Sequence, residues 1–237
     1  MQSNMTMRET EYVRFPKYVT QLVLSPEAAF HGLVGQPRWV FASILSGFIA
    51  LLQSFLIIHH IGLQQLLATI IGVKGSIDPQ AMLQNGMQHQ TSILVSEVLS
   101  SFFGPFGSVL IATSVVTLIL ASLYGKVSFR FIAATIAHVI LYVDLFRFLI
   151  IISVLYSGST ASFHVINPIG TNIGFYVLTG TASLNALLTH LDIATLLGLI
   201  LCIWSLGHGL PKISLLGRTG AVMIAWGFYL GTVCLFA

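Results

Sequence analysis

Charged residues are scarce in this sequence. Asp, Glu, Lys and Arg make up 7% of its 237 residues, whereas hydrophobic residues make up 56%. Water-soluble domains carry about a quarter charged residues, because a surface in contact with water needs them. So few charges exclude a soluble globular protein and predict an integral membrane protein. The net charge of +3 does not indicate nucleic-acid binding, since the basic residues lie in short segments between apolar runs.

Cysteines and catalytic motifs are also lacking. Cys202 and Cys234 are the two cysteines, and both lie within apolar runs, which favours packing residues over a disulfide. The sequence has no Gly-x-Ser-x-Gly, no His-Glu-x-x-His, no phosphate-binding loop, and no serine or cysteine beside an evident base. We therefore expect a protein that is not an enzyme and that needs no cofactor or metal.

Five apolar stretches have about the length of a membrane-spanning helix, which takes about 20 residues. They cover residues 39–58, 106–124, 131–155, 191–206 and 220–237. A shorter apolar piece, residues 93–103, precedes the second stretch, and Gly104-Pro105-Phe106-Gly107 joins the two. Proline there predicts either a kink or a short interfacial helix leading into the span. The predicted fold is therefore all-α, a polytopic bundle of five transmembrane helices.

The positions of Lys and Arg give these spans a direction, because basic residues are retained in the cytoplasm during insertion. Eight of the ten lie before the first span or in the second-to-third and fourth-to-fifth connections: Arg8, Arg14, Lys17, Arg38, Lys126, Arg130, Lys212 and Arg218. Lys74 lies in another connection and Arg147 lies within a span. We therefore expect the N-terminus in the cytoplasm and the C-terminus outside.

Residues 1–38 are predicted to form a cytoplasmic segment, and residues 39–237 the membrane domain. Ser25-Pro26-Glu27 has the pattern of a helix start, with a capping serine and proline at the first helical position. Ala28, Phe30, Leu33 and Val34 follow as an apolar stripe, which would lie on the cytoplasmic membrane surface as an interfacial helix. A connecting segment with no surface role is the alternative.

Three motifs, in this order, resemble those of the bacterial Yip1-domain family. Leu24-Ser25-Pro26, followed by Trp39 just before the first span, resembles the opening of that family. Gly125–Arg130 resembles its short basic loop between the second and third spans, and Leu191-Asp192-Ile193 resembles its entry to the fourth. The resemblance covers nearly the whole chain from about residue 20, and it implies the same five-span plan.

That resemblance implies a multi-pass protein of the prokaryotic cytoplasmic (inner) membrane without enzymatic activity. Eukaryotic Yip1-type proteins are membrane proteins of the early secretory pathway. They associate with Rab GTPases and with each other. Their long cytosolic N-terminal regions have no counterpart in the 38 residues before the first span. We therefore do not expect association with a GTPase.

Asp144 and Arg147 are ionisable residues within the third span. Each such residue costs about 2.5–3.5 kcal/mol on insertion scales, so both are candidates for function. Their spacing of three residues places them on one helix face. A charge pair of this kind would gate a polar path or relay protons. The alternative, which we favour, is a self-neutralising pair that faces the bundle interior and fixes how the third span packs.

His138 and Asp192 form a second, possible polar site. A buried histidine usually hydrogen-bonds to a neighbouring helix, and a role in proton transfer is the alternative for His138. Thr189-His190-Leu191-Asp192 fits a capping box with Thr189 as the cap, which explains Asp192 without any function. His190 and Asp192 lack the spacing of four residues that brings two metal ligands onto one helix face.

Small residues recur at four-residue spacing in two spans. Ala42, Ser46 and Ala50 do so in the first span, and Gly227 and Gly231 form a Gly-x-x-x-Gly in the fifth. Such ridges let helices approach closely in lipid. Packing within the bundle is the first interpretation, and self-association or docking onto another membrane protein is the second.

Two functions are compatible with these patterns. The first is a non-enzymatic membrane scaffold or accessory subunit, with the first and fifth spans contacting other integral membrane proteins or a second copy. Its basic loops would touch anionic lipid headgroups, and nucleic acid would not be a partner. The alternative is a small permease or ion-coupled transporter that uses Asp144 and Arg147.

Overall fold

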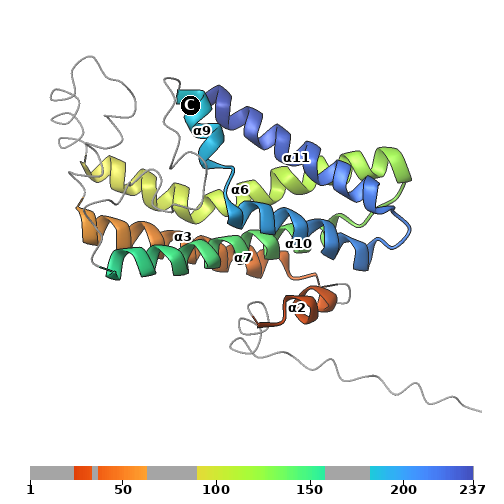
Figure 1. Ribbon diagram of the computed structural model, residues 1–237, viewed down its shortest axis with the longest axis horizontal. Coiled ribbons are helices and arrows are strands. Elements are labelled where there is room, and N and C mark those ends of the chain that lie inside the picture. Colours follow the sequence, from red (N-terminus) through yellow and green to blue (C-terminus); the bar gives the residue numbers. More distant parts are fainter. Residues whose placement is uncertain (1–23, 34–36, 63–89, 158–181, 237) are drawn as a thin grey trace, which may run out of the picture.

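The computed structural model of the chain describes residues 24–33, 37–62, 90–157 and 182–236 (Figure 1). Seven α-helices make up this part of the chain. They are α2 (Pro26–Gly32), α3 (Trp39–Ile61), α6 (Gln90–Tyr124), α7 (Phe129–Tyr156), α9 (Ala182–Thr189), α10 (Ile193–Gly209) and α11 (Leu215–Phe236).

Three of these helices, α3, α6 and α7, are long and apolar enough to cross a membrane. They coincide with the first three spans predicted from the sequence. The chain is therefore a multi-pass integral membrane protein with a helical bundle. α10 is also apolar but has 17 residues, and α11 has 22. These two helices lie where the sequence predicts the fourth and fifth spans, whose crossing stays a prediction.

α6 is one continuous helix that contains Pro105. Of the two alternatives for this segment, the structure has the kink, because residues 93–103 belong to α6 and form no separate interfacial helix. The ribbon of α6 bends partway along its length (Figure 1). Proline supplies no backbone donor and its ring crowds the preceding turn, which bends a helix. At 35 residues α6 is about 52 Å long. That exceeds the roughly 30 Å hydrocarbon core of a bilayer.

A tight turn joins α6 to α7. Gly125 ends α6 with φ +82°, a conformation that favours glycine, and its N–H donates to the carbonyl of Ala121 at 2.9 Å. Ser128 then begins α7 as its N-cap, since its hydroxyl accepts the N–H of Phe131 at 3.3 Å. The Gly-Lys-Val-Ser-Phe-Arg motif of residues 125–130 is thus a helix stop followed by a helix start.

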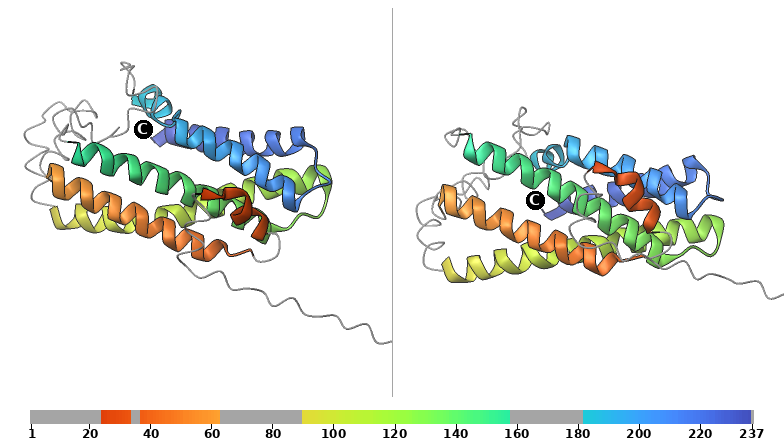
Figure 2. Two further views of the ribbon diagram at one scale, coloured as in Figure 1. Left: turned by 60° about the horizontal axis from the view of Figure 1, so that its bottom comes forward. Right: turned by 90° about the horizontal axis from the view of Figure 1, so that it is seen from below.

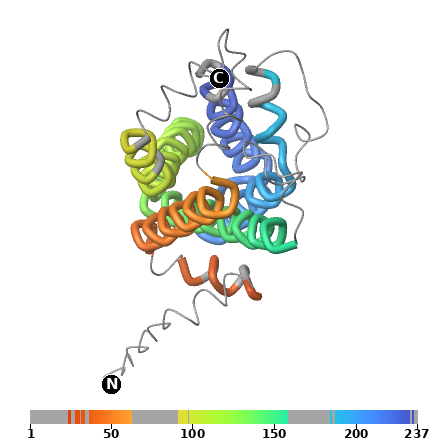
Figure 3. Tube along the Cα trace, turned by 90° about the vertical axis from the view of Figure 1, so that its left-hand side faces the viewer, coloured from red at the N-terminus to blue at the C-terminus, as the bar shows by residue number. Residues whose placement is uncertain are grey.

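The bundle is arranged around α7. α3 packs against both α6 and α7, α7 also contacts α10, and α11 contacts α6, α9 and α10. The end-on view shows α3 beside the first half of α6 on one side and α7 on the other (Figure 3). The first half of α7 is the most deeply buried part of the core, with Ile132, Ala133, Ala134 and Ala137 fully covered.

Small residues carry the close helix contacts. Lipid tails are as apolar as leucine, so helices in a membrane associate by close packing and by hydrogen bonds rather than by excluding water. A Cβ added at Gly47 of α3 would lie 2.5 Å from the carbonyl oxygen of Phe102 in α6. A Cβ added at Gly198 of α10 would lie 2.7 Å from a methyl group of Val143 in α7. These glycines bring their helices close enough for backbone to touch the neighbouring helix.

The predicted small-residue stripe of α3 lies inside the bundle. Ala42 and Ser46 are fully buried and Ala50 is partly buried. The stripe of α11 differs, because Gly227 and Gly231 are both exposed and an added Cβ at either would meet no atom within 4 Å. The same spacing of small residues therefore serves internal packing in one helix and faces outward in the other.

α2 forms where the sequence predicts a helix, but its apolar face packs against the bundle. Phe30 is fully buried, and its ring meets the edges of His138 and Trp204 at centroid distances of 6.4 and 6.5 Å. Leu33 is also buried, Ala28 is exposed, and Val34 lies outside the described residues. Figure 2 shows α2 lying across the bundle beside α7 and α10. Phe30 and Leu33 of the predicted membrane-surface stripe are thus covered by protein, because side chains of the bundle pack against them more closely than lipid would.

Candidate functional site

Polar side chains meet beside the middle of α7. Asp144 lies about 22 Å from the first residue of α7 and about 18 Å from its last, at 1.5 Å per residue. Its carboxylate accepts a hydrogen bond from the hydroxyl of Ser46 on α3. Asp144 keeps a partly exposed surface. The bond ties α7 to α3 near the middle of both helices.

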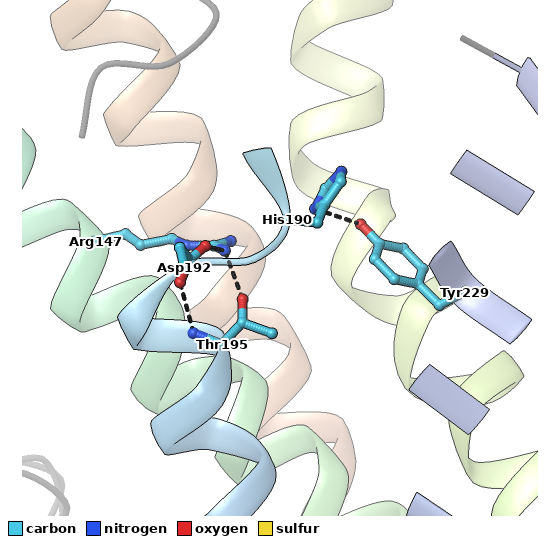
Figure 4. A network of polar contacts seen from close by, with 5 residues as sticks. All are labelled: Arg147, His190, Asp192, Thr195 and Tyr229. Atoms are coloured by element: carbon cyan, nitrogen blue, oxygen red, sulfur yellow. Dashed lines mark hydrogen bonds and ion pairs between the residues drawn. The ribbon is translucent and has the colours of Figure 1, made fainter. Parts of the chain in front are cut away.

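One turn further along α7, Arg147 reaches in the other direction. Its Nη2 forms an ion pair with Asp192 and donates a hydrogen bond to the hydroxyl of Thr195 at 3.0 Å (Figure 4). The Arg147 side chain is 29% exposed and that of Asp192 is 7% exposed. This partly buried pair ties α7 to the start of α10.

The structure therefore differs from the predicted pair of Asp144 and Arg147. Among the described residues Arg147 forms its ion pair with Asp192, and Asp144 bonds to Ser46 instead. The short Asp144 side chain meets α3, whereas the long Arg147 side chain extends across to α10. Each charge thus finds a partner on a different neighbouring helix, although both lie on one face of α7.

The predicted capping box is wrong, because Asp192 itself is the N-cap of α10. Its backbone is extended at φ −110° and ψ 158°, and its carboxylate accepts the N–H of Thr195 at 2.6 Å. α9 ends at Thr189, so that residue belongs to the preceding helix. A carboxylate at this place also faces the positive end of the helix dipole. One side chain thus caps α10 and neutralises Arg147.

α10 begins inside the length of the bundle. It is about 25 Å long, against about 42 Å for α7. Its start at Asp192 lies beside Arg147, nine residues before α7 ends. Residues 190–192 interrupt the helical path between α9 and α10 at this depth. Buried backbone needs partners in a membrane, and the N–H groups of His190 and Leu191 donate to Leu187 and Leu188 at 3.1 and 3.3 Å.

His190 continues the network toward α11. Its Nδ1 and the hydroxyl of Tyr229 share a hydrogen bond at 3.4 Å, whose direction depends on the imidazole tautomer, and the two rings meet edge to face (Figure 4). Burial, together with the nearby charge of Arg147, lowers the pKa of His190 below its usual value of 6.5. The lowered pKa favours the neutral imidazole, so Arg147 is the cation that lies beside the carboxyl groups of Asp144 and Asp192.

His138 does not join this network. It is fully buried in the first half of α7, where its Nδ1–H donates to the carbonyl of Ala134 one turn earlier at 2.7 Å. This bond lies within its own helix, and the predicted bond to a neighbouring helix stays a prediction. Its ring meets Phe30 of α2. Of the possible polar site predicted from the sequence, Asp192 is part of the network and His138 is not.

Four members of the network are missing from the sequence-based site. Ser46 was expected to pack or to dock, His190 was weighed only as a metal ligand, and Thr195 and Tyr229 carry no motif. A weak signal exists for the contact of Thr195 with Asp192. Asp is a common N-cap residue, and its carboxylate accepts the backbone N–H of a residue two or three positions later. Tyr229 comes from α11, and nothing in its neighbours along the chain points to His190.

The described residues contain no metal-binding cluster, and the hollow found among them is separate from the network. No three His, Cys, Asp or Glu side chains of this part lie close enough to hold a metal ion. One open hollow of about 830 Å³ has its described lining on α6 alone: Thr91, Ser92, Val95, Ser96, Leu99, Ser100 and Phe103. None of those residues belongs to the network.

Comparison with known proteins adds no family. No family model, no curated protein and no solved structure matches the chain. The resemblance to bacterial Yip1-domain proteins therefore stays a prediction from the sequence motifs. The class that the helices define is a multi-pass helical membrane protein, and its distinguishing feature is the polar network that links α3, α7, α10 and α11.

Proposed function

We propose that this chain is a non-enzymatic scaffold or accessory subunit of a membrane protein complex, of the Yip1-like type, in the cytoplasmic membrane of a prokaryote. It would contact another integral membrane protein, or a second copy of itself, through the outer face of α11. The observation that carries this proposal is the open position of Gly227 and Gly231, where an added Cβ meets no atom within 4 Å.

The surroundings of these glycines support a helix-docking face. Ile224 and Phe228 are more than half exposed beside them, so small residues alternate with large apolar ones on the outside of α11. A partner helix can approach closely over two glycines four residues apart and pack against the large side chains that flank them. The corresponding stripe of α3 is already covered by its own bundle, whereas the stripe of α11 is open.

The charges support a structural use. Asp144 bonds to α3, Arg147 to the start of α10, and His190 to α11. Each bond joins two elements that are distant in sequence. Polar contacts of this kind hold the helices in position, which is what a scaffold requires.

The proposed topology has five spans with a cytoplasmic N-terminus. The α6–α7 and α10–α11 connections lie at one end of the bundle, since the Tyr124 side chain packs at Gly217 and the Phe131 ring packs at Gly209. Their basic residues therefore gather at that end: Lys126, Arg130, Lys212 and Arg218. We expect this end to face the cytoplasm and to touch anionic headgroups.

The test is recovery of a partner from native membranes. The tagged full-length chain, extracted in mild detergent after crosslinking, should bring down a stoichiometric membrane protein or a second copy. The variant Gly227→Leu/Gly231→Leu should lose that partner, because leucine side chains hold two helices apart. Gly107→Leu is the matched control, since Gly107 is a partly exposed helix glycine with nothing within 4 Å of an added Cβ. Recovery of monomer alone from the wild type, or equal recovery with the double variant, refutes the proposal.

A small ion-coupled permease is the second candidate function. The observation that favours it is the start of α10 inside the bundle beside Arg147, since interrupted helices at membrane depth line cavities in many transporters. Asp144→Asn combined with Arg147→Gln should then abolish an ion-dependent flux in vesicles. An unchanged flux in the folded double variant excludes this candidate.

A further inference from the structure

We propose that the carboxyl group of Asp144 is a proton-binding site of this protein, occupied when α3 and α7 are packed together. The site consists of Asp144 on α7 and Ser46 on α3, and its ligand is a single proton. This inference does not depend on the scaffold function, because it concerns the interior of the bundle rather than the outer face of α11.

The argument begins with the partners of each charge. Arg147 places one nitrogen against both Asp192 and Thr195, and Asp192 also accepts the backbone N–H of Thr195. Asp192 is thus supplied with an ion pair and a cap bond. Asp144 has the hydroxyl of Ser46 and no ion pair among the described residues. The second carboxylate of the network is therefore left without a cation of its own.

The position of Asp144 makes that excess charge unfavourable. It lies beside the middle of α7, where the protein and the surrounding lipid both have a low dielectric constant. A carboxylate at such a depth is stable as an anion only with a compensating charge or several donors. Binding one proton removes the excess charge without any rearrangement of the Arg147–Asp192 pair.

Ser46 is suited to both states of Asp144. A serine hydroxyl donates one hydrogen bond and also accepts. It donates to the ionised carboxylate, and it accepts from the carboxylic acid once the proton is bound. The contact between α3 and α7 therefore persists in either state, so proton binding needs no new partner.

The groups around Asp144 on each packed element favour one proton over other ligands. α3 presents the neutral Ser46, and α11 presents Tyr229, which lies near enough for the charge of Asp144 to act on it. The guanidinium of Arg147, on the same face of α7, also acts on Asp144, but its Nη2 is engaged by Asp192 and Thr195. A metal cation takes about six oxygen ligands in sites of this kind, and the described residues at Asp144 supply only the Ser46 hydroxyl besides the carboxylate itself.

Infrared difference spectroscopy of the full-length protein in lipid nanodiscs tests the proposal. Spectra recorded between alkaline and acidic buffer should show a carboxylic acid carbonyl band that grows as Asp144 takes up its proton. Asp144→Asn should remove this band, and Asp192→Asn should retain it. Ser46→Ala should keep the band but shift it to higher frequency, because the acid loses its acceptor. A role in packing alone predicts no such shift.

Three results overturn the inference. The first is a band that remains in Asp144→Asn, and the second is the absence of any titrating band in the wild type. The third is loss of the band on adding sodium at constant pH, since a metal cation would then compete for the carboxylate. If Asp144→Asn does not fold, wild-type protein labelled with carbon-13 at the aspartate carboxyls replaces it. The label must shift the band, and in Asp192→Asn only Asp78 and Asp144 remain as its source.

Discussion

Gly47 offers the sharpest test of how the bundle is held together. In Gly47→Ala the new methyl group would lie 2.5 Å from the carbonyl oxygen of Phe102, about 0.9 Å closer than the 3.4 Å at which ordinary contact begins. The obstacle is backbone of α6, which cannot rotate away as a side chain can. α3 and α6 must therefore move apart along a contact that they share over several turns.

The magnitude follows from two opposing effects. Overpacking of a tight interface costs about 1–3 kcal/mol, whereas alanine in place of glycine stabilises a helix by about 1 kcal/mol. Gly107→Ala is the matched control, because Gly107 also lies within a helix and an added Cβ there has no neighbour within 4 Å. The free energy of unfolding of Gly47→Ala should therefore lie about 1–3 kcal/mol below that of Gly107→Ala.

Reversible unfolding in mixed micelles of detergent and dodecyl sulfate, followed by circular dichroism, measures this difference. Both variants should be compared with the wild type at the same micelle composition. If Gly47→Ala is as stable as Gly107→Ala within about 0.5 kcal/mol, the close approach of α3 and α6 is refuted and with it the reasoning from small residues at helix contacts.

Three further predictions use the same preparation. Asp192→Asn keeps a capping oxygen and loses the charge, whereas Asp192→Ala loses both, so the alanine variant should unfold about 1 kcal/mol more easily; equal stabilities would contradict Asp192 as the N-cap. Because burial lowers the pKa of His190, the unfolded chain takes up that proton first, so stability should be full above about pH 6.5 and fall below it. His190→Gln should flatten this slope, and an unchanged slope would argue against a buried neutral His190. Single cysteines at Lys126 and Lys212, in a chain lacking Cys202 and Cys234, should react with an impermeant maleimide only from the cytoplasmic side; labelling from opposite sides would refute the five-span topology.

The helices over the first three spans could be predicted well from sequence because hydrophobicity is a local property. The predicted first span at residues 39–58 and third span at 131–155 match α3 and α7 to within three residues at each end. A short connection between residues 124 and 131 was also predicted, and the structure has its turn there, at Gly125 to Ser128. The continuity of α6 through Pro105 was not predicted, because proline permits either a kink or a break, and the helices packed around it decide between them.

The partners of the charged residues could not be predicted in this way. A spacing of three residues places Asp144 and Arg147 on one face of a helix, and it favours a pair between them. The actual partners depend on the depth at which α10 starts relative to α7, which places Asp192 within reach of Arg147. That depth is a property of how whole helices pack, and residue spacing along one helix does not contain it.

The sequence by itself determined that this is a helical membrane protein, the bounds of α3 and α7 to within three residues, and that its ionisable residues within the spans are few. Only the tertiary structure decided which faces are covered. Gly47 and Gly227 are both glycines in apolar helices, yet one touches the backbone of α6 and the other faces outward. The physical reason is that lipid and protein interior are equally apolar, so hydrophobicity marks a segment as membrane-buried without telling which side meets another helix.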